Sequence, residues 1–343
     1  MPSTSENKSL KSELSRIKIL LPTILSLGVI CYLFWDDLAS VGDMHWSWNS
    51  VIAILVAAVL VVIRELAYTL RIKTLSMGKL SWGSSLNSVL LWEFASSVTP
   101  TVIGGSAFAV LILKREGLSV GRSLATVLVT VVMDELFYVI SVPLVVICVG
   151  IDSFFPEFHG VQTLFYTGYI ITFVISVVIL SALFISPVKT RAFVLRIFQL
   201  PLLNKLKSKA ELWTEDWVIA SDSLKGAPKK IWIISGGATI VSWSARFLTL
   251  NALLYAFIDV VPNGDIIARQ LGMWIVMLLS PTPGASGIAE GAMPMFIEPV
   301  VCISAFGIVV LFWRFFTYYI YLIVGALILP RWLARTSDKN KLN

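Results

Sequence analysis

The chain has 343 residues, of which 57% are hydrophobic and only 14% are charged, and its mean hydropathy is +0.84. A water-soluble domain of this length does not need so much apolar surface, whereas runs long enough to cross about 30 Å of hydrocarbon recur along the chain. The sequence therefore predicts an all-α polytopic membrane protein. It speaks against nucleic-acid binding, because the basic residues behind the net charge of +6 lie mostly in short loops between apolar runs.

The first 17 residues are polar and charged, and we expect them to form a cytoplasmic tail. The apolar run that follows has no convincing small-residue cleavage site, which indicates a retained span and not a removed signal peptide. About six segments are long and apolar enough to be full spans. They are 18–35, 51–70, 122–149, 162–186, 231–258 and 300–329.

Two further apolar segments, 84–113 and 267–297, contain residues that break helices. The first holds Thr99, Pro100, Gly104 and Gly105, and the second holds Thr282, Pro283, Gly284, Gly287 and Gly291. Proline removes a backbone donor, and glycine tolerates otherwise forbidden dihedral angles. In hydrocarbon, irregular backbone persists only where it is buried in protein or faces a water-filled cavity. Two such breaks in corresponding halves indicate the central site of a transporter.

The basic residues predict the orientation of the chain. Most of them lie in the N-terminus, in residues 187–230, in the C-terminus and in the loops around the first broken segment (Arg71, Lys73 and Lys79 before it, Lys114, Arg115 and Arg122 after it). Segments 36–50, 150–161 and 259–266 contain no Lys or Arg. We therefore expect a multi-pass protein of the plasma (inner) membrane with both termini in the cytoplasm. The two broken segments are then re-entrant hairpins that enter from opposite sides and point toward each other.

The two halves of the chain repeat the same order of features. Each has two spans, the second with an arginine (Arg64 or Arg246), then a hairpin and a charged span, and the arginine precedes the hairpin proline by 36 and 37 residues. We expect one integral membrane domain over 1–343, built as an inverted-topology repeat. Its parts are the tails 1–17 and 330–343, the repeats 18–149 and 162–329, and a cytoplasmic loop 187–230. That loop is either an amphipathic helix on the anionic inner leaflet or a plain helical connector.

Ionisable residues inside the apolar segments each cost roughly 3 kcal/mol or more, so their presence calls for a reason. They are Arg64, Glu65, Glu93, Asp134, Glu135, Arg246, Glu290 and Arg314. Arginine grips phosphate with two parallel hydrogen bonds, and the exposed amides of helix breaks attract anions, so this set suits a lipid phosphate. Glu93, Asp134 and Glu135 are candidates for proton coupling or gating. The alternative is that the charges form buried ion pairs that only fix helix register.

We expect the substrate to contact the arginines and the two breaks. The candidate residues are Arg64, Thr99, Pro100, Gly104, Gly105, Arg246, Thr282, Pro283, Gly284, Gly287, Glu290 and Arg314. No metal or cofactor is expected, because the two histidines lie in predicted outer loops and Cys31, Cys148 and Cys302 show no metal-ligand spacing. No phosphate-binding GxxxxGK[ST] loop occurs either, so any transport is passive or coupled to an ion gradient.

The segments TPTVIGG, LKREG and SPTPGASGIAEGA give the chain a family resemblance. It resembles the lysylphosphatidylglycerol synthase transmembrane (flippase-like) family over about 15–335, in the membrane region only. The resemblance implies movement of lipids or lipid-linked sugars between leaflets. Pro283-Gly284-Ala285 stands where many members have Pro-Gly-Gly. Because no aminoacyl-transferase domain follows the last span, we do not expect this chain alone to lysinylate lipids.

Three functions remain open at this point. The first is a lipid flippase or transporter that moves an anionic phospholipid or a polyprenyl-phosphate-linked lipid through a cavity at the hairpin tips. The second is a membrane-embedded enzyme acting on lipid head groups, with Asp134 and Glu135 as its acids. The third is a non-catalytic partner of a separate glycosyl- or acyltransferase. Membrane lipids are the expected partners in each case, and the sequence does not predict the oligomeric state.

Overall fold

The computed structural model describes residues 16–35, 46–99, 101–155, 160–199, 207–278, 280–301, 303 and 306–342. Within these ranges the chain is helical and contains no strand. The helices long and apolar enough to cross a membrane are Trp48–Leu75, Val120–Val149, Val161–Ile185, Lys229–Leu254 and Phe306–Thr336. This confirms the prediction of an all-helical polytopic membrane protein. The predicted span 18–35 falls on α2 (Arg16–Leu33), whose apolar part Thr23–Leu33 is shorter than these five.

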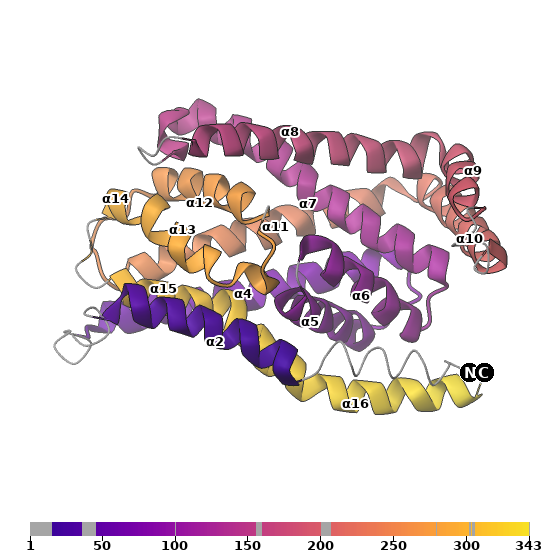
Figure 1. The fold of residues 1–343 in the computed structure, drawn as a ribbon, viewed down its shortest axis with the longest axis horizontal. Coiled ribbons are helices and arrows are strands. Elements are labelled where there is room, and N and C mark those ends of the chain that lie inside the picture. The colour runs from indigo at the N-terminus through magenta and orange to yellow at the C-terminus, as the bar shows by residue number, and fades with distance from the viewer. Residues whose placement is uncertain are drawn as a thin grey trace.

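Two helices from different halves form the centre of the bundle. α4 (Trp48–Leu75) and α11 (Lys229–Leu254) pack against each other along much of their length. α7 (Val120–Val149) contacts both of them, and α8 (Val161–Leu180) packs on the other side of α7. Figure 1 shows α8 along one edge of the molecule and α2 and α16 along the opposite edge. Each central helix therefore has protein on several sides, as the polar residues that it carries require.

Serine caps fix where several helices begin. The Oγ atoms of Ser47, Ser81 and Ser119 accept hydrogen bonds from backbone N–H groups at the starts of α4, α5 (Trp82–Val98) and α7, at 3.1, 3.1 and 3.3 Å. Such caps satisfy donors that the first helical turn leaves without a partner. The boundaries of these helices therefore follow from local sequence.

The first broken segment forms two short helices that pack side by side (Figure 1). α5 has 17 residues and α6 (Thr101–Arg115) has 15, fewer than the roughly 20 needed to cross a bilayer. Thr99 is extended (φ −103°, ψ 139°), as expected for a residue that precedes a proline. A Cβ on Gly105 would lie 2.1 Å from Ser96 Oγ, so glycine permits the close approach of the two helices.

The second broken segment also interrupts a helix. α12 (Asn263–Leu278) is followed by an irregular stretch with a single 3₁₀ turn, η5 (Pro283–Ala285), before α13 (Ile288–Phe296) and α14 (Glu298–Val301). Gly284 has φ 57° and the next residue, Ala285, has φ 54°. This left-handed region favours glycine, so the alanine at the Pro-Gly-Ala turn occupies a conformation that is unfavourable for it.

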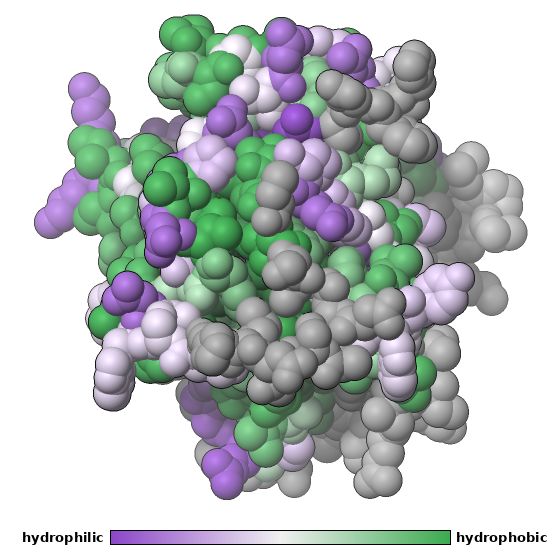
Figure 2. All heavy atoms as spheres, turned by 90° about the vertical axis from the view of Figure 1, so that its left-hand side faces the viewer, coloured by the Kyte–Doolittle hydropathy of each residue, from purple (hydrophilic) through white to green (hydrophobic). Residues whose placement is uncertain are grey.

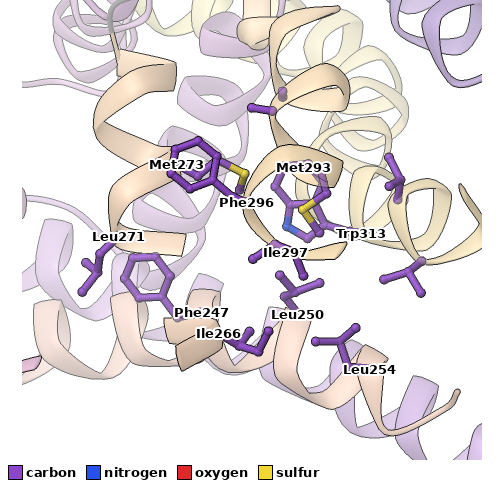
Figure 3. Packing of buried hydrophobic residues seen from close by; sticks show 14 of the residues in the cluster. Phe247, Leu250, Leu254, Ile266, Leu271, Met273, Met293, Phe296, Ile297 and Trp313 are labelled. Carbon is purple, nitrogen blue, oxygen red and sulfur yellow. The ribbon is translucent and has the colours of Figure 1, made fainter. Parts of the chain in front are cut away.

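The core lies around this second segment. Figure 3 shows Met273 and Phe296 in contact, with Met293 close to Trp313 and with Leu250 and Ile297 beneath them. All six side chains are buried. Because lipid tails are as apolar as these side chains, close van der Waals packing rather than release of water stabilises such a cluster in a membrane.

The last long helix is not regular. α15 (Phe306–Arg314) continues into a π-helical turn, η6 (Phe315–Tyr319), and then into α16 (Ile320–Leu342). α16 runs on through the segment predicted as a tail. There it lies against the end of the first hairpin, where Trp332 Nε1 donates a hydrogen bond of 2.7 Å to Glu116 Oε1 and Arg335 also pairs with that carboxylate.

The predicted loop 187–230 forms two helices, α9 (Pro187–Ile197) and α10 (Lys207–Lys225), which contact each other. α10 also packs on α7. In Figure 1 these helices lie at one end of the molecule, whereas α12 and α14 lie toward the other end. Figure 2 views the molecule from that other end, where apolar and hydrophilic residues are interspersed.

Candidate functional site

The two helix breaks lie against each other. Gly284, in the second break, is so close to Ser97, at the end of α5, that an added Cβ would lie 3.3 Å from the Ser97 carbonyl oxygen. Tyr318 bridges them, because its hydroxyl accepts a hydrogen bond from Ser286 Oγ (3.2 Å) and donates one to the Ser97 carbonyl (3.4 Å). Segments almost 190 residues apart in the sequence therefore meet at one point.

A cavity of about 250 Å³ opens beside this contact, and we call it the central cavity. Its wall is formed by residues of α4, α5, α6, α7, α11, α12, the two breaks, α15 and η6. Among the residues singled out from the sequence, those that line it are Glu93, Thr99, Asp134, Glu135, Arg246, Thr282, Gly284 and Arg314. Aromatic residues complete the wall: Tyr68, Trp92, Tyr138, Trp243, Trp274, Trp313 and Tyr318.

Arg246 is the arginine that faces the central cavity without a polar partner. Its guanidinium carbon lies 4.1 Å from the centre of the Trp274 ring and 5.3 Å from that of Trp243. Within the described part of the chain it makes no hydrogen bond and no ion pair. A guanidinium held over an aromatic ring keeps the N–H groups at its edge free for an oxygen acceptor. The geometry leaves a preoriented fork directed at the cavity.

Arg64 is buried and has its partners on the protein. Its guanidinium pairs with Glu65 Oε1 at 2.7 Å, with Glu93 Oε1 and with the hydroxyl of Tyr321. Tyr321 in turn donates a hydrogen bond of 2.8 Å to Glu65 Oε1. Arg64 does not line the central cavity, but it shares a smaller one of about 10 Å³ with Arg246.

A second buried arginine, Arg71, holds Asp134. The guanidinium donates two hydrogen bonds to the two carboxylate oxygens, at 2.6 and 3.0 Å, and a third to Thr239 Oγ1 at 2.9 Å. Trp243 Nε1 also donates to Asp134 Oδ1 at 2.7 Å. The prediction that Arg71 lies in a loop is wrong: α4 continues past the predicted end of the span, and the side chain is fully buried.

Arg314 and Glu290 form the third buried pair. Arg314 Nε lies 2.7 Å from Glu290 Oε1, although without the alignment of a hydrogen bond, and both terminal nitrogens reach the Gly284 carbonyl oxygen at 3.4 and 3.3 Å. Glu290 also accepts from the Gly287 N–H at 2.7 Å and from Ser26 Oγ of α2. This pair therefore satisfies polar backbone groups that the helix break exposes.

Other predicted residues lie behind the cavity wall or outside the description. Arg64, Gly105, Pro283, Gly287 and Glu290 are not part of the wall. Pro100 lies outside the described residues, and for Gly104 only its place in α6 is described. The described residues contain no cluster of three His, Cys, Asp or Glu side chains able to hold a metal ion.

Sequence reasoning missed the aromatic wall and Arg71. Trp243 precedes Arg246 by three residues on one helix, and this spacing was a usable signal because such residues share a face. No spacing in the sequence indicated Trp274, because it contacts Arg246 from a different helix, α12. The π-helical turn also separates two tyrosines that regular α-helical spacing from Arg314 would place on its face. The Arg314 guanidinium carbon lies 4.2 Å from the centre of the Tyr318 ring, whereas Tyr321 contacts Arg64.

Comparison with known proteins assigns the family. The model of the lysylphosphatidylglycerol synthase TM region matches residues 19–325, which include every element of the site. The chain belongs to this family. Within it, the chain is similar to a UPF0104 membrane protein of Archaeoglobus fulgidus, with 27% identity over 285 residues that cover 80% of this chain and 84% of the relative. No solved structure matches the chain.

Proposed function

We propose that this member of the lysylphosphatidylglycerol synthase transmembrane family is a lipid transporter, which moves an anionic phospholipid or a polyprenyl-phosphate-linked lipid between leaflets. The lipid phosphate binds Arg246 in the central cavity. A single observation carries this proposal: the Arg246 guanidinium stacks on tryptophan, faces a cavity where two helix breaks meet, and has no polar partner in the described part of the chain.

The free-energy cost of placing an arginine without a polar partner away from water supports the proposal. A charged side chain placed away from water is stabilised by an ion pair or by hydrogen bonds. Arg64, Arg71 and Arg314 each form an ion pair with a carboxylate of the protein. Arg246 instead has two aromatic faces, which position it but leave its donors unused. A phosphate oxyanion supplies the missing acceptors in the two-bond geometry that guanidinium groups favour.

The two helix breaks provide the route by which the lipid head group would pass between the leaflets. Both hairpins are inferred to enter the membrane without crossing it, from opposite sides, as the basic and acidic loops predict. Their contact at Ser97 and Gly284 then lies between the leaflets, next to the phosphate site. Glu93 is shared between this cavity and Arg64, and so it is positioned to act as a gate that responds to the charge at Arg246.

Reconstitution into vesicles tests this function. The measured quantity is the rate at which phosphatidylglycerol labelled on an acyl chain becomes accessible to an impermeant reductant. Hydrogen bonds to a charged group contribute about 1.5–3 kcal/mol, so Arg246→Ala is expected to slow movement roughly 10- to 100-fold. Arg246→Lys, which keeps the charge but not the fork, is expected to retain part of the rate.

The matched control is Arg196→Ala, because Arg196 is an exposed arginine on α9. It is expected to move lipid at the wild-type rate. Wild-type protein that moves no lipid of either class, or Arg246→Ala protein as fast as Arg196→Ala protein, would refute the proposed function.

A further inference from the structure

Glu135 is the second charged group of the central cavity that has no polar partner among the described residues. It lies on α7 and contributes to the cavity wall. Its carboxylate makes no hydrogen bond and no ion pair with any residue that the structure describes. A carboxylate that is partly buried without such a partner is as unusual as the unpaired guanidinium of Arg246.

The remaining charged groups of the cavity wall each have an ion-pair partner on the protein, and Arg64 serves both Glu65 and Glu93. Glu93 pairs with Arg64, Asp134 with Arg71, and Arg314 with Glu290. In the described wall, the charged groups without a hydrogen bond or an ion pair are one cation, Arg246, and one anion, Glu135, which do not pair with each other. A ligand that carries only a phosphate satisfies the first and leaves the second unmatched.

Aromatic side chains connect the two unmatched groups. Glu135 and Tyr138 lie three residues apart on one face of α7. The Tyr138 ring stacks on Trp274 with 6.1 Å between ring centres, and Trp274 carries the Arg246 guanidinium on its own face. Rings of this kind attract cationic groups through their electron-rich faces. The path from Arg246 to Glu135 is therefore lined by surfaces that tolerate an ammonium group.

We infer that the head group taken by this cavity is zwitterionic: a phosphodiester that also carries a primary ammonium group, as in a phosphoethanolamine lipid. Arg246 binds the phosphate, and the Glu135 carboxylate accepts hydrogen bonds from the ammonium. This inference rests on the proposed function, in which Arg246 binds the phosphate of a transported lipid, and it changes the preferred head group from anionic to zwitterionic. The Glu135 carboxylate also repels lipids whose head group has a phosphate but no cation.

The test compares two acyl-chain-labelled lipids in the same reconstituted vesicles, namely phosphatidylethanolamine and phosphatidylglycerol. Wild-type protein is expected to move the ethanolamine lipid faster. Glu135→Gln removes the charge and is expected to slow that lipid roughly 10- to 100-fold, the effect of losing a charged hydrogen bond. Movement of the glycerol lipid is expected to stay equal or to rise, which also shows that the variant is folded.

A second arm needs no variant. N-acetylation of the labelled ethanolamine lipid removes the ammonium group and keeps the phosphate, so wild-type protein is expected to treat it like the glycerol lipid. Glu211→Gln is the matched control, because Glu211 is an exposed glutamate on α10, and it is expected to keep the wild-type preference.

The outcomes separate this inference from the proposed function. Equal rates for the ethanolamine lipid and its acetylated form in wild-type protein overturn the inference. Equal slowing of the ethanolamine and glycerol lipids by Glu135→Gln also overturns it and points to a proton-carrying or structural role. In both cases the proposed function stands as long as Arg246→Ala slows the movement of both lipids relative to the Arg196→Ala control.

Discussion

Buried arginines of this protein differ in what surrounds them, and the difference separates structural from ligand-binding roles. Arg71 is fully buried and meets Asp134 through two hydrogen bonds, whereas Arg246 meets only rings. Both lie in long apolar helices, and the sequence distinguishes neither. The partners come from elsewhere: Asp134 is 63 residues from Arg71, and Tyr321 is 257 residues from Arg64. Composition and spacing identify a charged residue in an apolar segment. Whether that residue has a partner on the protein depends on contacts that only the fold provides.

The Arg71 pair leads to a stability prediction. Arg71→Met leaves the Asp134 carboxylate without its cation, and breaking one side of a buried pair costs about 3–5 kcal/mol. We expect the free energy of unfolding, measured by denaturant titration in detergent, to fall by about 3 kcal/mol. The double variant Arg71→Met with Asp134→Asn is expected to recover most of this loss.

Lys225→Met is the comparison for this experiment. Lys225 pairs with Asp222 at 3.3 Å on the surface of α10, with the aspartate side chain 63% exposed. Pairs of this kind contribute about 0–1 kcal/mol. A similar effect of Arg71→Met and Lys225→Met, or no recovery in the double variant, would show that the buried pair is not needed for stability.

At the scale of elements, proline and glycine predict where a helix ends better than they predict which elements it packs against. α5 ends directly before Thr99-Pro100, and α12 ends at Leu278, a few residues before the Thr282–Ala285 turn. The contact between the two breaks was anticipated only from loop charges, which is an argument about the whole chain. The π-helical turn at 315–319 has no proline or glycine and followed from nothing in the local sequence.

The Pro-Gly-Ala turn offers a pair of opposite predictions. A Cβ on Gly284 would lie 2.3 Å from Tyr318 Cε2 and would have to tolerate φ 57°, so Gly284→Ala is expected to destabilise the protein by about 2 kcal/mol or more. Ala285→Gly removes a side chain from φ 54° and is expected to stabilise it by about 1 kcal/mol. Thermal unfolding in detergent measures both changes. Shifts of the same sign in the two variants would contradict this account of the turn.

At the scale of the whole molecule, hydropathy and loop charge predicted a polytopic helical bundle and most of its spans. They predicted less about the segment 187–230 and the C-terminal segment, because amphipathic and polar helices carry no strong hydropathy signal. α10 and the end of α16 are helices stabilised by packing against α7 and the first hairpin. The two readings of 187–230, helix on the inner leaflet or helical connector, both remain predictions.

The prediction for the whole molecule is its orientation in the membrane, with the C-terminus in the cytoplasm and the segment 259–266 on the outer side. Single cysteines are placed at Lys339 and at Asp259 in a chain from which Cys31, Cys148 and Cys302 have been removed. With intact cells and an impermeant maleimide, we expect labelling at position 259, and at position 339 only after the cells are opened. The reverse pattern would turn both hairpins around, and labelling of both sites in intact cells would refute the inverted arrangement.

The π-helical turn sets the rotation of the residues after it, about the helix axis, relative to the residues before it. Each residue of an α-helix advances about 100° around the axis, so deleting one residue from 315–319 would rotate everything that follows by roughly that angle. Tyr321 would swing away from Arg64, and Trp332 from Glu116, while Arg314 kept its hold on Gly284. A single extra residue in one helix thus aligns both hairpins with the arginines between them.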